Sequence, residues 1–168
     1  NEGESVLRAK GSGRGWPLAA LMRGGKGGIS ASGTVRLEFD VTARLGVDTD
    51  LLRTLDGTAT ARVRNGRLGT GMLDLAGLGV LGRPPPSKLM HAESPLRCVK
   101  VPLAFNNGVG RTDPVIVIET DAVQALGRGT INLVRNTVDL YMVPRPLTAP
   151  GGAAGYSFTV KGSLDGPA

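Results

Sequence analysis

Cysteine, histidine and aromatic residues are nearly absent from this sequence. Among 168 residues there are one cysteine, Cys98, and one histidine, His91, and aromatic residues make up 4%. A single cysteine forms no internal disulfide, and one Cys with one His cannot complete the ligand set of a zinc site. Few aromatic rings argue against a surface that stacks nucleic-acid bases. We therefore expect no metal, no cofactor and no nucleic-acid partner.

Long hydrophobic runs are also missing. The apolar stretches have strand length, as at 115–118, and no segment reaches the length of a transmembrane helix or follows the pattern of a signal peptide. The length fits one domain, 1–168. Because residue 1 is Asn, we expect a processed piece or a fragment of a longer protein, in which any anchor or leader would lie upstream.

Motifs of known enzyme classes are absent as well. Gly24-Gly25-Lys26 is similar to the end of a phosphate-binding loop, but Ala20 occupies the first glycine position and Gly27 the Ser/Thr position. No nucleophile-elbow pattern is present, and His91 lies near no recognisable nucleophile motif. We predict that the chain is not an enzyme and has no catalytic residues.

Glycine and proline are abundant, with 26 and 11 residues. Without a collagen period, so many turn formers predict short strands joined by turns. The expected strands are 4–10, 29–44, 57–64, 67–71, 96–105, 109–111, 115–120, 129–134, 137–143 and 156–164. Short helices are expected at 16–23, at 49–55 with Thr49 as the cap, and at 74–81. Asn65-Gly66 is predicted to form a hairpin turn.

The clearest pattern lies in residues 29–44, where apolar or small residues alternate strictly with polar ones. This period of two predicts a strand with one face in water, and Gly33 is a candidate bulge in so long a strand. Residues 115–118 are apolar on both faces, and 99–105 nearly so, which requires cover on both sides. A sandwich, a packed helix, a partner or lipid would supply that cover. Cys98, on the face opposite Val99, is expected to be a buried, inert thiol.

The charge is unevenly distributed. Residues 57–100 carry seven basic and two acidic side chains within a chain of net charge +6. This basic stretch could meet an anionic partner such as lipid headgroups. A solvated, soluble surface is the alternative interpretation.

The order of the segments resembles the C-terminal region of the AsmA family, envelope proteins of Gram-negative bacteria. The resemblance covers roughly residues 18–168 and rests on an ordered series of sequence segments. They are ISASGTVRLEFDV, LRTLDGTATARVRNGRLGTGMLDL, VPLAFNNGVGRTDPVIVIETDAVQALGRGTINLVRNTVDLYMVPRP and VKGSLDGP.

This resemblance implies a non-enzymatic periplasmic module, tethered to the inner membrane in the full-length protein. It would take part in phospholipid transport between the two membranes and in outer-membrane biogenesis. The implied fold is mainly β, a curved antiparallel sheet forming a groove, with two or three short helices. The alternative function is a structural module that binds outer-membrane or envelope proteins through exposed sheet edges.

Small aliphatic side chains suit the wall of a lipid groove, and removing about sixteen carbons from water stabilises binding by roughly 10–13 kcal/mol. The candidate contacts to phospholipid or another acyl lipid are apolar strand residues: Ile29, Val35, Leu37, Phe39, Val41, Val99, Val101, Leu103, Phe105, Val115 and Val117. The candidate contacts to headgroups are Arg62, Arg64 and Arg67. A solvated strand face is the alternative interpretation of these arginines.

Overall fold

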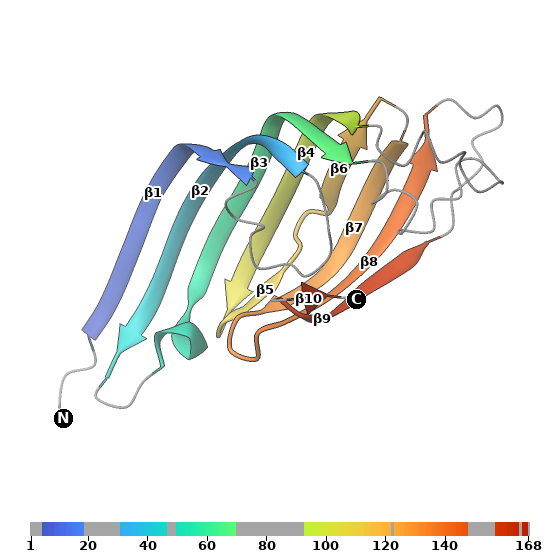
Figure 1. Cartoon of the computed structure of the whole chain (residues 1–168). Helices are drawn as coiled ribbons and strands as arrows, with labels where there is room; N and C mark the ends of the chain where they lie inside the picture. Colours follow the sequence, from blue (N-terminus) through green and yellow to red (C-terminus); the bar gives the residue numbers. More distant parts are fainter. Residues whose placement is uncertain are drawn as a thin grey trace.

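All strands of the described chain belong to one antiparallel sheet (Figure 1). The computed structural model describes residues 5–18, 31–46, 50–69, 93–121, 123–147, 157–164 and 166–167. The strands are β1 (Ser5–Pro17), β2 (Ala31–Leu45), β3 (Asp56–Gly69), β4 (Glu93–Asn106), β5 (Val109–Arg111), β6 (Ile116–Thr120), β7 (Val123–Asn132), β8 (Thr137–Pro146), β9 (Phe158–Ser163) and β10 (Gly166–Pro167). The expected mainly β fold is confirmed.

Strands that follow one another in the chain are neighbours in the sheet, in the order β1-β2-β3-β4-β5-β7-β8-β9-β10. The short strands β5 and β6 share one place, because each pairs with both β4 and β7. Turns containing Asn107-Gly108 and Arg135-Asn136 join β4 to β5 and β7 to β8. This meander topology needs only local connections.

The pairing register separates the side chains into two faces. Leu37 of β2 lies opposite Ala61 of β3, which lies opposite Val101 of β4. The adjacent positions Arg36, Arg62 and Lys100 are also paired with one another, on the other side. We call the side of Leu37 the apolar face and the side of Arg36 the polar face. The alternation expected for residues 29–44 is confirmed over β2.

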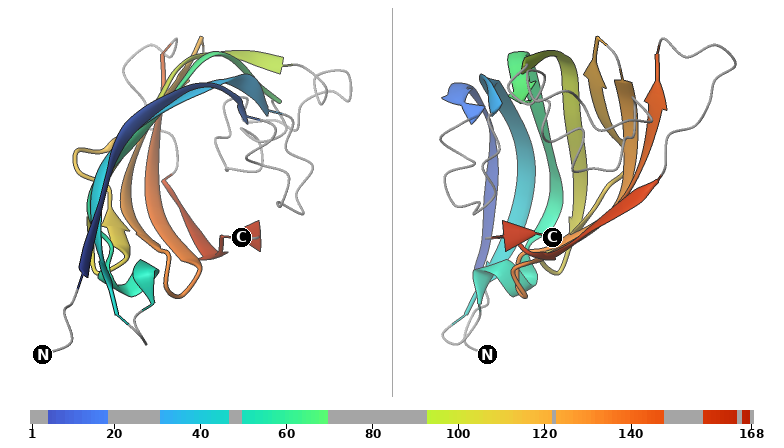
Figure 2. Two further views of the ribbon diagram at one scale, coloured as in Figure 1. Left: turned by 90° about the vertical axis from the view of Figure 1, so that its left-hand side faces the viewer. Right: turned by 45° about the vertical axis from the view of Figure 1, so that its right-hand side comes forward.

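The sheet is strongly curved (Figure 2). The least exposed hydrophobic side chains of the described residues lie on the apolar face, so we assign this face to the concave side, where neighbouring strands shield it. Crowding on this face agrees with that placement. A Cβ added at Gly127 would lie 2.4 Å from Sδ of Met142, and one at Gly110 would lie 2.7 Å from Cε1 of Phe105. Side chains converge on the inside of a curve, so glycine at these positions permits it.

Four neighbouring strands are irregular at adjacent positions. The register shifts between Arg14 and Trp16 in β1, between Ser32 and Thr34 in β2, and between Leu96 and Cys98 in β4. In β3, Asn65 has φ 52°. Bulges bend a strand and increase its twist, and β1–β4 bend sharply at this end in Figure 1.

This row of bulges corrects one prediction and confirms another. Asn65-Gly66 does not form a hairpin, because β3 continues through it to Gly69, and the expected strand 67–71 is partly the end of β3. Asn65 has the positive φ that the sequence signal requires, but in a bulge instead of a turn. The bulge expected at Gly33 is confirmed.

The predicted helices fare less well. Trp16 and Pro17 pair with β2 as the end of β1, so the predicted helix does not include them. Leu18 is helical, and the rest of the predicted helix 16–23 lies outside the described residues. The segment 49–55 contains a single 3-10 turn, η1 (Leu51–Thr54), capped by Asp50, whose side chain accepts a hydrogen bond from Leu52 N. The predicted helix at 74–81 lies outside the described residues. In the described part of the chain, no helix has the length and apolar character needed to cross a membrane.

Candidate functional site

The apolar face forms continuous rows of hydrophobic side chains across the sheet. One row consists of consecutive cross-strand partners from β2, β3, β4, β6, β7 and β8: Val35, Val63, Val99, Ile118, Ala125 and Pro144. Its five inter-strand steps of about 4.8 Å span roughly 24 Å. In the paired segments 35–43, 57–63, 99–105, 116–118, 123–131 and 138–144, the positions of this face carry no charged side chain.

Burial is uneven along this face. Among the described residues, the nine hydrophobic residues with the lowest exposure all lie on it, including Val123 and Ile116, which are each 3% exposed. The middle of β2 and β4 is different, because Phe39, Val101 and Leu103 remain half-buried. The concave side therefore combines a well-packed region over β6–β8 with a partly accessible apolar floor over β2–β4.

Most of the apolar candidates from the sequence meet on this floor. The register places the following eight on the apolar face: Val35, Leu37, Phe39, Val41, Val99, Val101, Leu103 and Phe105. Ile29 lies outside the described residues. Val117 pairs with Lys100 on the polar face, which corrects its assignment to the groove. Val115 precedes β6 and is half-buried, and no strand pairing assigns it to either face. Their neighbours Ile116 and Ile118 lie on the apolar face instead. When every position of a strand is apolar, the sequence does not indicate whether the odd or the even positions point inward.

Sequence reasoning missed the apolar positions in the second half of the sheet. Val138, Leu140 and Met142 of β8 lie on the apolar face, opposite Ile131, Gly129 and Gly127 of β7. Their signal was available, because they alternate with the polar residues Asp139 and Tyr141.

The arginines proposed as headgroup contacts do not border the apolar floor. Arg62 and Arg64 lie on the polar face, and Nη1 of Arg62 is 2.7 Å from Oε2 of Glu38. Arg67, beyond the bulge, is exposed and lies opposite Ser32 and Pro95. Because a sheet separates its two sides, Arg62 and Arg64 cannot hold the headgroup of a chain that lies on the apolar face.

Ion pairs link the strands across the polar face. Asp40 of β2 accepts from Arg8 and Lys10 of β1, each with a nitrogen 3.1 Å from Oδ2. Hydrogen bonding from Arg8, followed by that from Lys10, lowers the pKa of Asp40 below its usual value. The Arg62 hydrogen bond is the main cause of the lowered pKa of Glu38. These partly exposed pairs fix register more than they stabilise the fold.

Cys98 lies on the polar face as expected, opposite Glu119, but it is exposed. The predicted burial is therefore wrong. The sandwich that would have covered this face is not formed by the described residues, whose strands all belong to one sheet.

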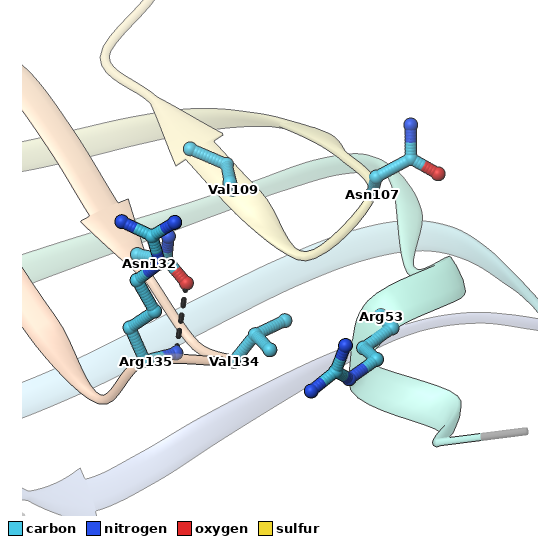
Figure 3. Close-up of a pocket in the computed structure, with 6 residues that line it drawn as sticks. All are labelled: Arg53, Asn107, Val109, Asn132, Val134 and Arg135. Atoms are coloured by element: carbon cyan, nitrogen blue, oxygen red, sulfur yellow. Dashed lines mark hydrogen bonds between the residues drawn. The ribbon is translucent and has the colours of Figure 1, made fainter.

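A shallow depression of about 470 Å³ lies where η1 meets the β4–β5 and β7–β8 turns (Figure 3). Its lining is mixed: Arg53, Asn107, Val109, Asn132, Val134 and Arg135. Oδ1 of Asn132 accepts from the backbone N of Arg135 at 2.9 Å. None of these side chain types serves as a nucleophile or general base at neutral pH, so the depression offers no catalytic set.

The described ranges also hold no group of three His, Cys, Asp or Glu side chains that could bind a metal ion. Comparisons with family models, curated proteins and solved structures found no match to this chain. The candidate site is thus defined by the concave apolar face alone.

Proposed function

We propose that this chain is a non-enzymatic β-groove module that holds the acyl chains of phospholipid on its concave apolar face. It serves phospholipid transport between the inner and outer membranes and outer-membrane biogenesis, in a periplasmic protein tethered to the inner membrane. The supporting observation is a partly accessible apolar floor without charged side chains in its paired strand segments. The resemblance of the ordered segments to the AsmA family points to the same function.

The chemistry of the floor favours hydrocarbon over a protein partner. Valine, leucine and alanine dominate it, and Leu37, Ala61 and Val101 offer neither donors nor acceptors. An extended protein segment on this floor would leave backbone groups unpaired, whereas an acyl chain has no polar group to satisfy. Each buried CH₂ contributes about 0.8 kcal/mol without any specific recognition.

One pair of variants on β4 tests this proposal. Val101→Asp places a carboxylate on the apolar floor, whereas Ala104→Asp places the same group on the polar face, opposite Arg111. Native mass spectrometry of gently extracted protein should show bound phospholipid for the natural chain and for Ala104→Asp. Val101→Asp should lose at least about tenfold in lipid occupancy, because burying a charge beside hydrocarbon is strongly unfavourable.

Circular dichroism of each variant separates lost binding from lost folding. If a folded Val101→Asp protein retains the same phospholipid, the acyl chains do not lie on this floor. A lipid-free spectrum of the natural, folded chain would contradict the proposal for these 168 residues.

The long edge strand β1 favours a second candidate, docking of an envelope protein by strand addition. β1 spans 13 residues, pairs only with β2 in the described part of the chain, and exposes Val6 and Leu7 by 67% and 47%. A photoreactive side chain at Ser12 should then form a protein adduct that the same group at Thr60 of β3 does not. Lipid adducts at both positions would count against docking.

A further inference from the structure

Four basic side chains form a row straight across the polar face of the sheet. Arg14 of β1 is the register partner of Arg36 of β2, Arg36 of Arg62 in β3, and Arg62 of Lys100 in β4. With strands about 4.8 Å apart, the row is roughly 14 Å long. We call these four residues the cationic row.

Such an arrangement works against folding. Like charges directly opposite one another in adjacent strands destabilise a sheet. Among the described residues, Glu38 alone relieves the row by ion pairing, with oxygens 2.9 Å from Nη2 of Arg36 and 2.7 Å from Nη1 of Arg62. One carboxylate for four cations leaves a net charge of about +3 on this part of the surface, which is typical of a site that awaits anions.

The other acid of β2 does not alter this balance. Asp40, two positions beyond Glu38, is itself paired with Arg8 and Lys10. Arg64, exposed on the same face, adds a further positive charge beside Thr34. The polar face of β1–β4 is therefore basic around the row as well as along it.

We propose that the cationic row binds the surface of a bilayer rich in anionic phospholipids. The register places the row on the polar face, opposite the apolar floor and therefore on the convex side of the curved sheet, so this proposal does not depend on acyl chains in the groove. Anionic headgroups diffuse laterally in a fluid bilayer and can gather beneath a row of any curvature. A rigid nucleic-acid duplex would touch a convex face at few phosphates, and the row includes no aromatic side chain for stacking.

Docked in this way, the module would lie with its convex back on the membrane and its concave side turned away from it. Binding would fall steeply with salt, because headgroup and guanidinium charges at a surface are screened within about 10 Å at 0.1 M. Each cation near an anionic surface raises affinity about fivefold.

The test uses vesicles with 30% phosphatidylglycerol in phosphatidylcholine and the two ends of the row. Arg14→Gln combined with Lys100→Gln removes two charges for which the structure gives no ion-pair partner. Arg128→Gln combined with Arg145→Gln makes the same change in net charge over β7 and β8 of the same face. Flotation should show about 25-fold weaker binding for the first variant and less than threefold for the second.

Urea denaturation measures the stability of the same variants. If the row had only a structural role, removing two of its charges would lower that stability. Because the row is repulsive, the first variant should unfold at the same or a higher urea concentration than the natural chain. Equal losses of vesicle binding in the two double variants would overturn the proposal in favour of net charge alone. Binding to vesicles of pure phosphatidylcholine, or a tighter salt-dependent binding to duplex DNA that the first variant loses, would also overturn it. The groove variant Val101→Asp should bind these vesicles normally, whatever its acyl-chain occupancy.

Discussion

The two faces of β1–β4 differ in almost every respect, although they are made by the same strands. The apolar face carries small aliphatic side chains and glycine, whereas the polar face carries ion pairs and the cationic row. A flat sheet with one oily face would need a second layer to cover it. Here the sheet curves, so neighbouring strands shield part of the same face, and the remainder stays accessible.

Curvature and charge are thus divided between the faces. Glycine is placed where the inside of the bend leaves no room for a Cβ, while arginine and lysine occupy the outside, where side chains diverge. Variants that interchange these properties should reveal how far each face depends on its own composition.

The largest effect is expected at Gly57, where the close approach of β2 meets a positive φ. Its φ is +124°, and an added Cβ would lie 2.3 Å from the carbonyl oxygen of Asp40. Gly57→Ala should lower the free energy of unfolding by about 2–4 kcal/mol through backbone strain and overlap. Urea denaturation measures it.

Gly15→Ala is the matched control, because Gly15 has φ +86° but no atom within 4 Å of an added Cβ. It should lose only about 1–2 kcal/mol, the conformational part. Equal losses at the two sites would show that close strand approach does not limit the curvature.

A smaller effect is expected from shortening valines on opposite faces. Val123 on the apolar face is 3% exposed, whereas Val117 on the polar face is half-buried. Val123→Ala should destabilise the fold by about 2 kcal/mol, since it leaves a cavity, and Val117→Ala by less than about 1 kcal/mol. Thermal or urea unfolding compares the stabilities of the two variants directly. A larger loss for Val117→Ala would contradict the assignment of the packed core to the apolar face.

The smallest effect is expected from the ion pairs of the polar face. Asp40 has a pKa below its ordinary value of 3.8 because Arg8 and Lys10 donate to it. A lowered folded-state pKa stabilises the fold above the ordinary value, and that stabilisation disappears as pH falls through the lowered value. Asp40→Asn should therefore be slightly less stable than the natural chain at pH 7, and the gap should close below about pH 4.

Salt provides the check on this last expectation. In 1 M NaCl the difference between Asp40→Asn and the natural chain should shrink at pH 7 as well, because exposed pairs are screened. A stability difference that persists at low pH and high salt would arise from packing. The polar face would then not depend on its ion pairs in the way proposed.

The sequence predicted the fold class and the apolar floor of β2–β4 because their alternation has one interpretation. Val35, Leu37 and Val41 could be assigned to one face from period alone. The face of Val117 could not be assigned in this way, because odd and even positions look the same in a run that is apolar throughout. Asn65 misled for a related reason: a positive φ serves a bulge as well as a turn, and only the partner strand decides between them.

The row of bulges across β1–β4 has a consequence for changes in chain length. One extra residue inserted between Gly57 and Val63 would exchange the two faces of the strand there. Arg62 would then point to the apolar face, and the alanines would point to the polar face. The existing extra residues do no such harm, because Asn65 and Arg97 fall between the same two paired positions and shift both strands together. Insertions in this half of the sheet should accordingly be tolerated only as matched sets on adjacent strands, whereas single substitutions need no such coordination.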